Sequence, residues 1–173
     1  MDYKDKKDRQ EKEIVCYQLL DELGIDYTAI DHPAANTIAD CAEVDRRLGV
    51  DMCKNLFLCN TQKTNFYLLM LPGEKVFKTK DISKQLGVAR LSFAPAEYME
   101  AYLNISPGSV SIMGLMNDRE KHVRLLIDKD ILTQEFVGCH PCVNTSSLKI
   151  SVKDLIKTFL PAVDHSYTEV TVE

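Results

Sequence analysis

The segment from residue 138 to residue 151, GCHPCVNTSSLKIS, places a Cys-x-x-Cys pair, a histidine and an asparagine within fourteen positions. Two thiols at this spacing are typical of redox centres and of one half of a zinc site. His140 and Asn144 could instead offer a ring nitrogen and an amide to a substrate. The segment is therefore compatible with redox chemistry, metal binding or substrate binding.

The redox interpretation depends on the residues C-terminal to the two cysteines. An activated thiol at Cys139 needs the N-terminus of a helix, where the helix dipole favours the thiolate. The residues after Cys142, VNTSSLKIS, favour a strand, and Cys139 lies about four-fifths of the way along the chain. We therefore expect Cys139 and Cys142 to be small side chains beside a bend.

A zinc site would need two further ligands. The candidates are Cys53 and Cys59, or His32 and His122. No second Cys-x-x-Cys and no His-x₃-His accompanies them, whereas structural zinc sites carry such paired spacings. We expect no metal ion and no cofactor.

Two similar segments, HPAANT at 32–37 and HPCVNT at 140–145, each begin with histidine and proline. Proline fixes φ, and asparagine and threonine bond to nearby backbone groups, so both segments are turns by composition. Loops at strand ends are also where sheet proteins place binding residues. His32 and His140 would face one pocket if other polar residues converge there.

Two further stretches could supply such residues. Lys54 and Asn55 precede an apolar run, where they mark solvent or present a cation and an amide to an anionic or carbonyl ligand. In PGSVSIMGLMND, Gly108 and Gly114 flank a loop whose backbone groups could approach a ligand closely, with Ser109 beside them.

The elements that position these residues can be predicted from hydrophobic periodicity and end signals. Helices are expected over 9–23, 37–48, 79–86 and 96–103, and from Ser151 to a stop at Pro161. Strands are expected over 25–30, 55–59, 66–71, 90–93, 123–127, 135–137 and 147–150. The runs 55–59 and 66–71 are apolar on both faces and form a central hairpin, covered on each side.

The alternation of helices and strands predicts an α/β fold, a single domain with a mixed β-sheet flanked by helices. The 173 residues suit one domain, 1–173, with loose termini at about 1–8 and 164–173.

Charge and hydropathy exclude several function classes. A net charge of −5 argues against broad binding to duplex DNA, although residues 74–90 hold five Lys or Arg against two acids. That segment is a solvated helix surface or a small basic face for a few phosphates. No apolar run approaches the ~18 residues of a membrane span, and the six cysteines are too sparse for a disulfide scaffold. We expect a cytoplasmic protein.

Taken in order, CKNLFLCN, LPGEKVFKTKDISKQLG, SPGSVSIMGLMND and GCHPCVNTSSLKIS resemble the ProX/YbaK family of stand-alone prolyl-tRNA editing proteins. The last is similar to the family pattern HPxxNTASLxIS. Two positions depart from the family. Ile112 stands where related domains have the proline of a Gly-x-x-x-Pro loop, and Cys142 stands where many relatives have a small residue such as glycine. Both departures bear on substrate size.

The resemblance implies hydrolysis of the ester of a mischarged tRNA(Pro), most similar to the alanyl-tRNA(Pro) deacylases. The alternatives are a cysteinyl-tRNA(Pro) deacylase and a non-catalytic module of the same fold that binds tRNA or a synthetase. The partners that the resemblance implies for the protein are the tRNA(Pro) acceptor end and prolyl-tRNA synthetase.

The resemblance also assigns roles to residues. It implies catalytic roles for Lys54, Asn55 and His140, with Lys54 orienting the terminal phosphate or ribose. Residues implied to line the substrate pocket are His32, Gly108, Ser109, Gly114 and Asn144. Basic residues implied to contact the single-stranded acceptor end are Lys75, Lys78, Lys80 and Lys84.

Overall fold

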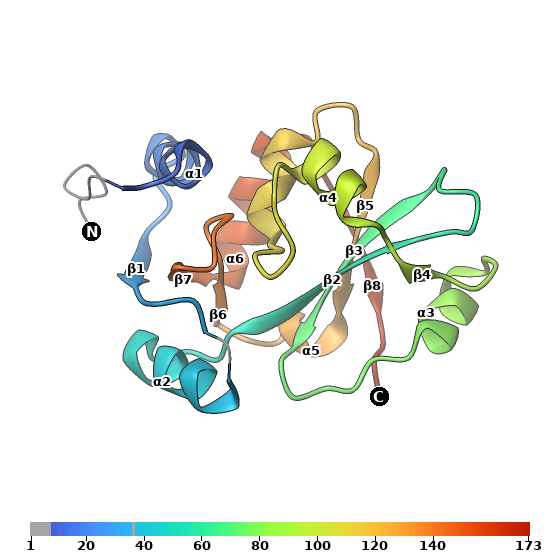
Figure 1. The fold of residues 1–173 in the computed structure, drawn as a ribbon, viewed down its shortest axis with the longest axis horizontal. Helices are drawn as coiled ribbons and strands as arrows, with labels where there is room; N and C mark the ends of the chain where they lie inside the picture. Colours follow the sequence, from blue (N-terminus) through green and yellow to red (C-terminus); the bar gives the residue numbers. More distant parts are fainter. Residues whose placement is uncertain (1–7, 36) are drawn as a thin grey trace.

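Two β-sheets form the frame of the molecule (Figure 1). The computed structural model describes residues 8–35 and 37–173. The larger sheet has the order β4-β2-β3-β5-β8 and is mixed, and the smaller sheet, β1-β7-β6, is antiparallel. The strands are β1 Tyr27–Asp31, β2 Cys53–Cys59, β3 Phe66–Pro72, β4 Ser92–Phe93, β5 Val123–Asp128, β6 Phe136–Cys139, β7 Ser146–Ser151 and β8 Tyr167–Val170.

Helices pack on both faces of the larger sheet, and the helix Ile38–Leu48 packs against β1 and β7 of the smaller one. The helices are α1 Glu11–Glu22, α2 Ile38–Leu48, α3 Thr79–Leu86, α4 Ala96–Leu103, the 3₁₀ helix η2 Ile112–Asn117, α5 Lys129–Leu132, α6 Val152–Asp154, the π-helical η3 Leu155–Phe159 and α7 Leu160–Ala162. Among the described residues, no helix is long and apolar enough to cross a membrane. The predicted α/β class, with a mixed sheet flanked by helices, is confirmed.

Local end signals account for the helix that follows the first histidine loop. The Thr37 hydroxyl accepts the Asp40 N–H at 3.0 Å, and the Asp40 carboxylate accepts the Thr37 N–H at 3.1 Å. This reciprocal pair is a capping box, and Gly49 ends α2 in the left-handed region at φ 73°. The helices predicted over 79–86 and 96–103 occupy those residues as α3 and α4.

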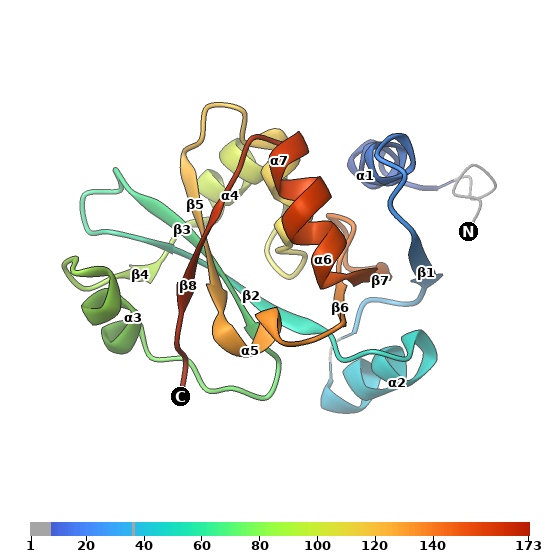
Figure 2. The ribbon, with the colours of Figure 1, turned by 180° about the vertical axis from the view of Figure 1, so that it is seen from behind.

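The predicted central hairpin is also confirmed. Strands β2 and β3 pair in antiparallel register from Cys53↔Pro72 to Cys59↔Phe66, and β3 is buried along its whole length. One face of the hairpin packs in the larger core beneath α4, η2 and α6 to α7, and the other packs beneath α3. Figure 2 shows α6 and α7 lying over the first of these faces. Burial on both faces explains why the two runs lack polar alternation.

The expectation of a loose C-terminus is wrong. Tyr167–Val170 forms β8, which pairs in parallel with β5, and the Val172 N–H donates to the Asp128 carboxylate at 3.0 Å. The short segment is a strand because an exposed edge of the larger sheet pairs with it. Of the N-terminal range predicted to be loose, residues 1–7 lie outside the described residues.

Pro161 does not end the last helical segment, contrary to the sequence prediction. The segment runs to Ala162, with Ser151 as its N-cap as predicted. The π-helical turn at Leu155–Phe159 directly precedes Leu160, and Pro161 falls in the first turn of α7. The helix continues up to this residue, because the Leu160 N–H donates to the Leu155 carbonyl, and the proline removes only its own N–H from the ladder.

Candidate active site

The smaller sheet was not anticipated, and it determines where the site lies. Strands β1 and β7 pair with Asp31↔Ser146 and Ile30↔Ser147, which brings the two histidine loops side by side. The His32 N–H donates to the Thr145 carbonyl at 3.0 Å, and the ring centroids of His32 and His140 are 6.5 Å apart.

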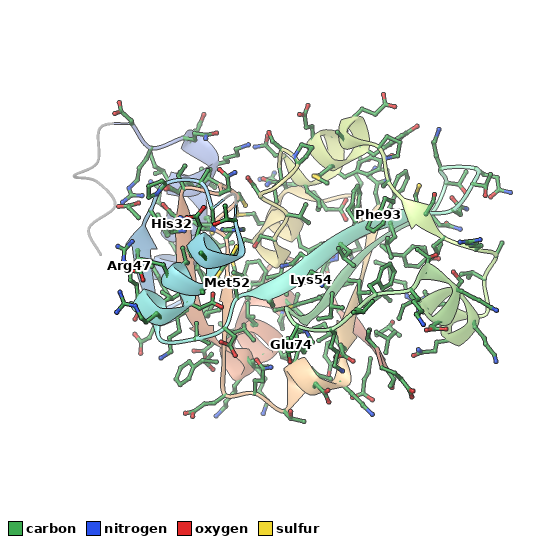
Figure 3. All side chains as sticks on the ribbon, turned by 60° about the horizontal axis from the view of Figure 1, so that its bottom comes forward. His32, Arg47, Met52, Lys54, Glu74 and Phe93 are labelled. Carbon is green, nitrogen blue, oxygen red and sulfur yellow. The ribbon has the colours of Figure 1, made fainter. Side chains whose placement is uncertain are left out.

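A cavity of about 600 Å³ opens where the two sheets meet, beside α2. Five of the predicted site residues line it, and they are His32, Lys54, Gly108, His140 and Asn144. The other lining residues are Ala35, Thr37, Cys41, Val44, Asp45, Met52, Cys53, Gly73 and Ser147. Figure 3 shows His32, Met52 and Lys54 following one another along this side of the molecule. The condition set by the sequence, that other polar residues converge on the histidine loops, is met.

One β-bridge brings Lys54 close to His140. Met52 in the approach to β2 pairs in parallel with Gly138 of β6, and each bridge residue lies two positions before one of the two site residues. A Cβ atom at Gly138 would lie 2.7 Å from the Met52 Sδ and 3.2 Å from its Cα. Glycine is required at this position because the two backbones approach so closely.

Lys54 is half-buried at the cavity wall. Its ammonium donates to the Lys75 carbonyl at 2.8 Å, and an ammonium has two further N–H donors for a ligand. Neighbouring residues of a strand point to opposite faces, so Asn55 lies on the other side of β2. Its amide donates to the Cys53 Sγ at 3.3 Å, and its Oδ1 is buried without a hydrogen-bond partner in residues 8–35 and 37–173. Asn55 does not line the cavity, unlike Lys54.

A chain of hydrogen bonds connects the two histidines. His32 Nδ1 lies 2.8 Å from the Pro33 carbonyl, which can only accept, so Nδ1 carries the proton and Nε2 of the neutral ring accepts. The Ser147 hydroxyl, 2.7 Å from that Nε2, is then the donor. His140 Nδ1 lies 3.0 Å from the Ser146 carbonyl and 3.5 Å from the Ser147 hydroxyl, so it donates. In the neutral His140 ring, Nε2 is therefore left as an acceptor.

Burial favours this neutral form of His140. Removal of the ring from water lowers its pKa below the ordinary value of 6.5, and the neighbouring His32 lowers it further. The bond to the Ser146 carbonyl acts in the opposite direction. At neutral pH the cavity thus presents a cation at Lys54 and a neutral acceptor at His140.

A buried ionic cluster lies next to the chain of hydrogen bonds that connects His32 and His140. The Ser146 hydroxyl lies 2.9 Å from Glu13 and 2.7 Å from Asp31. The Arg9 guanidinium donates to both carboxylates, at 2.7 Å to Glu13 and 3.0 Å to Asp31. Asp31 precedes His32, so this cluster holds β1, β7 and the start of α1 in one arrangement.

The glycine-containing loop contributes only its first part to the cavity. Gly108 lines it at φ 90°, and a Cβ there would lie 3.7 Å from the Asn144 amide nitrogen. Ser109 is buried and does not line the cavity. Gly114 packs against the core, because a Cβ would lie 2.6 Å from Ile105 Cδ1. Gly114 therefore serves packing, in place of the substrate-binding role that the resemblance implied.

Ile112, where the family has proline, is the first residue of η2 and is fully buried in the core. Proline is favoured at the first helical position because the N–H there needs no intrahelical partner. Ile112 therefore fits the same path of the chain and does not line the cavity.

The two cysteines of the segment 138–151 are structural. Cys139 ends a strand and Cys142 lies in a turn, and both thiols are buried. Burial raises the pKa of Cys139 well above its ordinary value, which disfavours the thiolate that redox chemistry needs. Cys142 adopts φ 66°, in the left-handed region that favours glycine.

Residues 8–35 and 37–173 contain no group of three His, Cys, Asp or Glu side chains that could hold a metal ion. Within those ranges the candidate ligands named from the sequence do not form such a group.

Lys75 has a structural role that the sequence did not reveal. Its ammonium contacts Asp128 at 2.7 Å, Asp130 at 2.6 Å and the Val172 carbonyl at 2.7 Å, so it is engaged within the protein. The other predicted tRNA-contact residues are exposed, and they are Lys78, Lys80 and Lys84.

Sequence reasoning missed three polar residues of the cavity, which are Thr37, Asp45 and Ser147. Ser147 could have been found only by pairing the two histidine loops, since its contacts are 115 and 7 residues away in the chain. Asp45 of α2 accepts the Met52 N–H at 3.2 Å, and burial raises the pKa of its carboxyl group.

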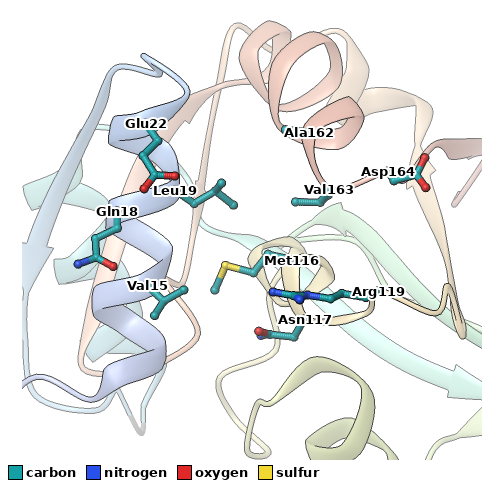
Figure 4. A pocket seen from close by; sticks show the side chains of 10 residues that line it. All are labelled: Val15, Gln18, Leu19, Glu22, Met116, Asn117, Arg119, Ala162, Val163 and Asp164. Carbon is teal, nitrogen blue, oxygen red and sulfur yellow. The ribbon is translucent and has the colours of Figure 1, made fainter.

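A second cavity, of about 440 Å³, lies between α1, η2 and α7 (Figure 4). None of the predicted site residues lines it.

Comparison with known proteins identifies the family of the chain. The sequence model of the family described as "Aminoacyl-tRNA editing domain" matches residues 32–158. The chain is 32% identical over 138 residues to the prolyl-tRNA editing protein ProX of Acetoanaerobium sticklandii, covering 80% of this chain and 84% of the relative. It is 26% identical over 151 residues to prolyl-tRNA synthetase associated domain-containing protein 1 of Danio rerio, covering 86% and 81%.

A solved structure described as a candidate trans-editing enzyme for prolyl tRNA synthetase superposes with a TM-score of 0.72 at 14% identity, covering 95% of this chain and 98% of that one. That likeness concerns the fold. The resemblance drawn from the motifs is confirmed, and the chain belongs to the aminoacyl-tRNA editing domain family.

Proposed function

We propose that the protein hydrolyses the ester of mischarged tRNA(Pro), with alanyl-tRNA(Pro) as the preferred substrate. The observation that carries the proposal is one cavity that brings the Lys54 cation beside the neutral His140 in a member of the editing family. The ProX relative is named a prolyl-tRNA editing protein, which supports tRNA(Pro) as the substrate. Prolyl-tRNA synthetase is the proposed partner, and the cytoplasm, where tRNA is charged, the proposed location.

In the proposed reaction, Lys54 binds the terminal phosphate or the ribose oxygens and thereby places the ester carbonyl in the cavity. Water attacks the carbonyl carbon, the bond from that carbon to the ribose oxygen breaks, and the ribose oxygen takes up a proton from the water. An aminoacyl ester is an activated substrate, so orientation of water and stabilisation of the oxyanion supply most of the rate. His140 Nε2 accepts a hydrogen bond from the water or from the amino group.

The proposed selectivity is a size sieve. A synthetase site for proline discriminates poorly against the smaller alanine, because alanine lacks only two methylene groups, each worth about 1–3 kcal/mol. A second site that admits the smaller side chain and excludes the larger one corrects the error. The apolar lining from Ala35, Cys41 and Val44 suits a small side chain.

The test is a comparison of alanyl-, cysteinyl- and prolyl-tRNA(Pro) hydrolysis by the purified protein. We expect alanyl-tRNA(Pro) to be hydrolysed roughly a hundredfold faster than prolyl-tRNA(Pro), because the cavity excludes the larger side chain. If cysteinyl-tRNA(Pro) were hydrolysed faster than alanyl-tRNA(Pro), the proposed substrate would be wrong and the proposed reaction would be retained. Failure to hydrolyse all three would refute the proposal and favour the non-catalytic binding module.

We expect activity to depend on neutral His140. Because burial lowers the pKa of His140 from 6.5, the ring stays neutral at pH 7 and gains a proton only at a more acidic pH than an ordinary histidine. The ratio of the wild-type rate to the His140→Gln rate should be constant at neutral and alkaline pH and fall toward acid pH. The ratio cancels the intrinsic pH dependence of ester hydrolysis. A ratio that rises toward acid would show that the protonated ring is the active form.

A further inference from the structure

An exposed apolar strip, made of Val76, Phe77 and Phe93, lies on the surface near the start of α3. Val76 is 72% exposed and Phe93 62%, the two highest values among the large apolar residues of the described chain. The rings of Phe77 and Phe93 meet edge to face, with centroids 6.2 Å apart. Phe77 also packs against the core beneath α3, so the pair is held in place while the Phe93 ring faces solvent.

The strip begins next to the candidate active site along the chain. Lys54 donates to the carbonyl of Lys75, and the chain then runs directly into Val76 and Phe77. Phe93 pairs with Leu58 across β2 and β4, and Lys54 and Leu58 project from the same face of β2. Lys54 and Leu58 are four residues apart along β2, which corresponds to about 13 Å between their Cα atoms. Figure 3 shows Lys54 between His32 and Phe93.

The charge around the strip is positive. Exposed cations of the surrounding segment are Lys78, Lys80, Lys84 and Arg90, and its exposed acids are Glu74 and Asp81. The exposed Glu173 also lines the hollow beside Val76, Lys78 and Lys84, which leaves four positive charges against three negative ones. The remaining cation, Lys75, is paired with Asp128 and Asp130. An exposed aromatic ring beside several cations suits single-stranded nucleic acid, because bases stack on the ring while cations contact the phosphates.

We propose that the strip binds the single-stranded nucleotides that precede the terminal nucleotide of the tRNA acceptor end, with one base stacked on Phe93. The inference rests on the proposed function, since the terminal nucleotide then lies at Lys54. A few nucleotides of single strand span the distance from Lys54 to Phe93. Stacking is tolerant of sequence because every base has a π-face, so the strip contributes affinity for any acceptor end.

The test measures binding of an unacylated, fluorescently labelled single-stranded RNA that ends in CCA, the common end of tRNAs, by fluorescence polarisation. Phe93→Ala should raise the Kd roughly tenfold, the loss expected for one stacked base, and Phe93→Tyr should stay near wild type. The matched control is Phe136→Ala, an exposed phenylalanine on β6, which should leave the Kd unchanged. Circular dichroism confirms that each variant is folded.

Three results would overturn the proposal: no RNA binding by the wild type, an unchanged Kd in Phe93→Ala, or an equal loss in Phe136→Ala. Hydrolysis assays separate this inference from the proposed function. If alanyl-tRNA(Pro) is not hydrolysed but Phe93→Ala raises the Kd for RNA, the proposed function is refuted and RNA binding by the strip is retained. If alanyl-tRNA(Pro) is hydrolysed but Phe93→Ala leaves the Kd for RNA unchanged, only RNA binding by the strip is refuted. In an active enzyme, Phe93→Ala should raise the KM for alanyl-tRNA(Pro) and leave that for alanyl-adenosine unchanged.

Discussion

Lys54→Ala is expected to lower kcat/KM for alanyl-tRNA(Pro) by about 100- to 1000-fold, the loss typical of removing one charged donor that orients a reacting group. The ammonium is the cation of the cavity wall, and its one hydrogen bond within the described protein is to the Lys75 carbonyl. Loss of that bond removes no buried charge pair, so the fold should be retained. Single-turnover hydrolysis and a thermal unfolding scan would measure the two effects separately.

The matched control for this variant is Lys157→Ala, which removes an exposed lysine of η3 that does not line the cavity. It should hydrolyse alanyl-tRNA(Pro) at the wild-type rate. If Lys54→Ala retained a rate within about threefold of wild type, Lys54 would have no role in the reaction, and the central assignment of the site would be lost.

Arg9→Met is expected to lower the free energy of unfolding by about 3–5 kcal/mol, the usual cost of removing one partner of a buried ion pair. The Arg9 and Glu13 side chains are 1% and 2% exposed, so methionine would leave a buried carboxylate without its cation. The second carboxylate, Asp31, adjoins His32, so the hydrogen bonds that connect His32 and His140 should weaken as well. Urea denaturation of both proteins, compared at equal m-values, measures the change.

An exposed pair provides the comparison. Arg46 and Glu43 on α2 lie 2.6 Å apart with side chains 72% and 53% exposed. Exposed pairs contribute little to stability because water screens them, so Arg46→Met should leave the unfolding midpoint nearly unchanged. Equal losses in the two arginine variants would contradict the claim that burial makes the Arg9 cluster important.

Elements with local signals were predictable from the sequence. The capping pair Thr37 and Asp40 and the left-handed Gly49 defined α2 because each acts within one turn of helix. The hairpin of β2 and β3 was predicted from two apolar runs separated by a polar loop. Non-local pairing was not predictable. Strand β8 pairs with β5, about 40 residues earlier in the chain. Its Tyr, Thr and Val favour a strand, but so short a segment does not show which sheet edge it joins.

The same distinction between local signals and non-local pairing applies to the residues of the candidate site. Lys54 and His140 were identified from motifs, and the structure places both at the cavity. Ser147 was missed because its partners are set by the pairing of β1 with β7. Lys75 was misassigned because its ion pairs lie in β5 and α5, more than 50 residues away. Charge alone did not distinguish this paired lysine from its exposed neighbours.

The bridge between Met52 and Gly138 has a consequence for the precision of a size sieve. In residues 8–35 and 37–173 it is the one β-bridge outside the named strands, and it joins two otherwise separate ladders. Lys54 belongs to the larger sheet and His140 follows β6 of the smaller one, so the width of the cavity is set by the distance between the two sheets. A shift of one sheet against the other would change that width while the strand pairing within each sheet stays intact. The proposed discrimination between alanine and proline therefore depends on how firmly the two sheets are held together, by this bridge and by the hydrophobic core that they share.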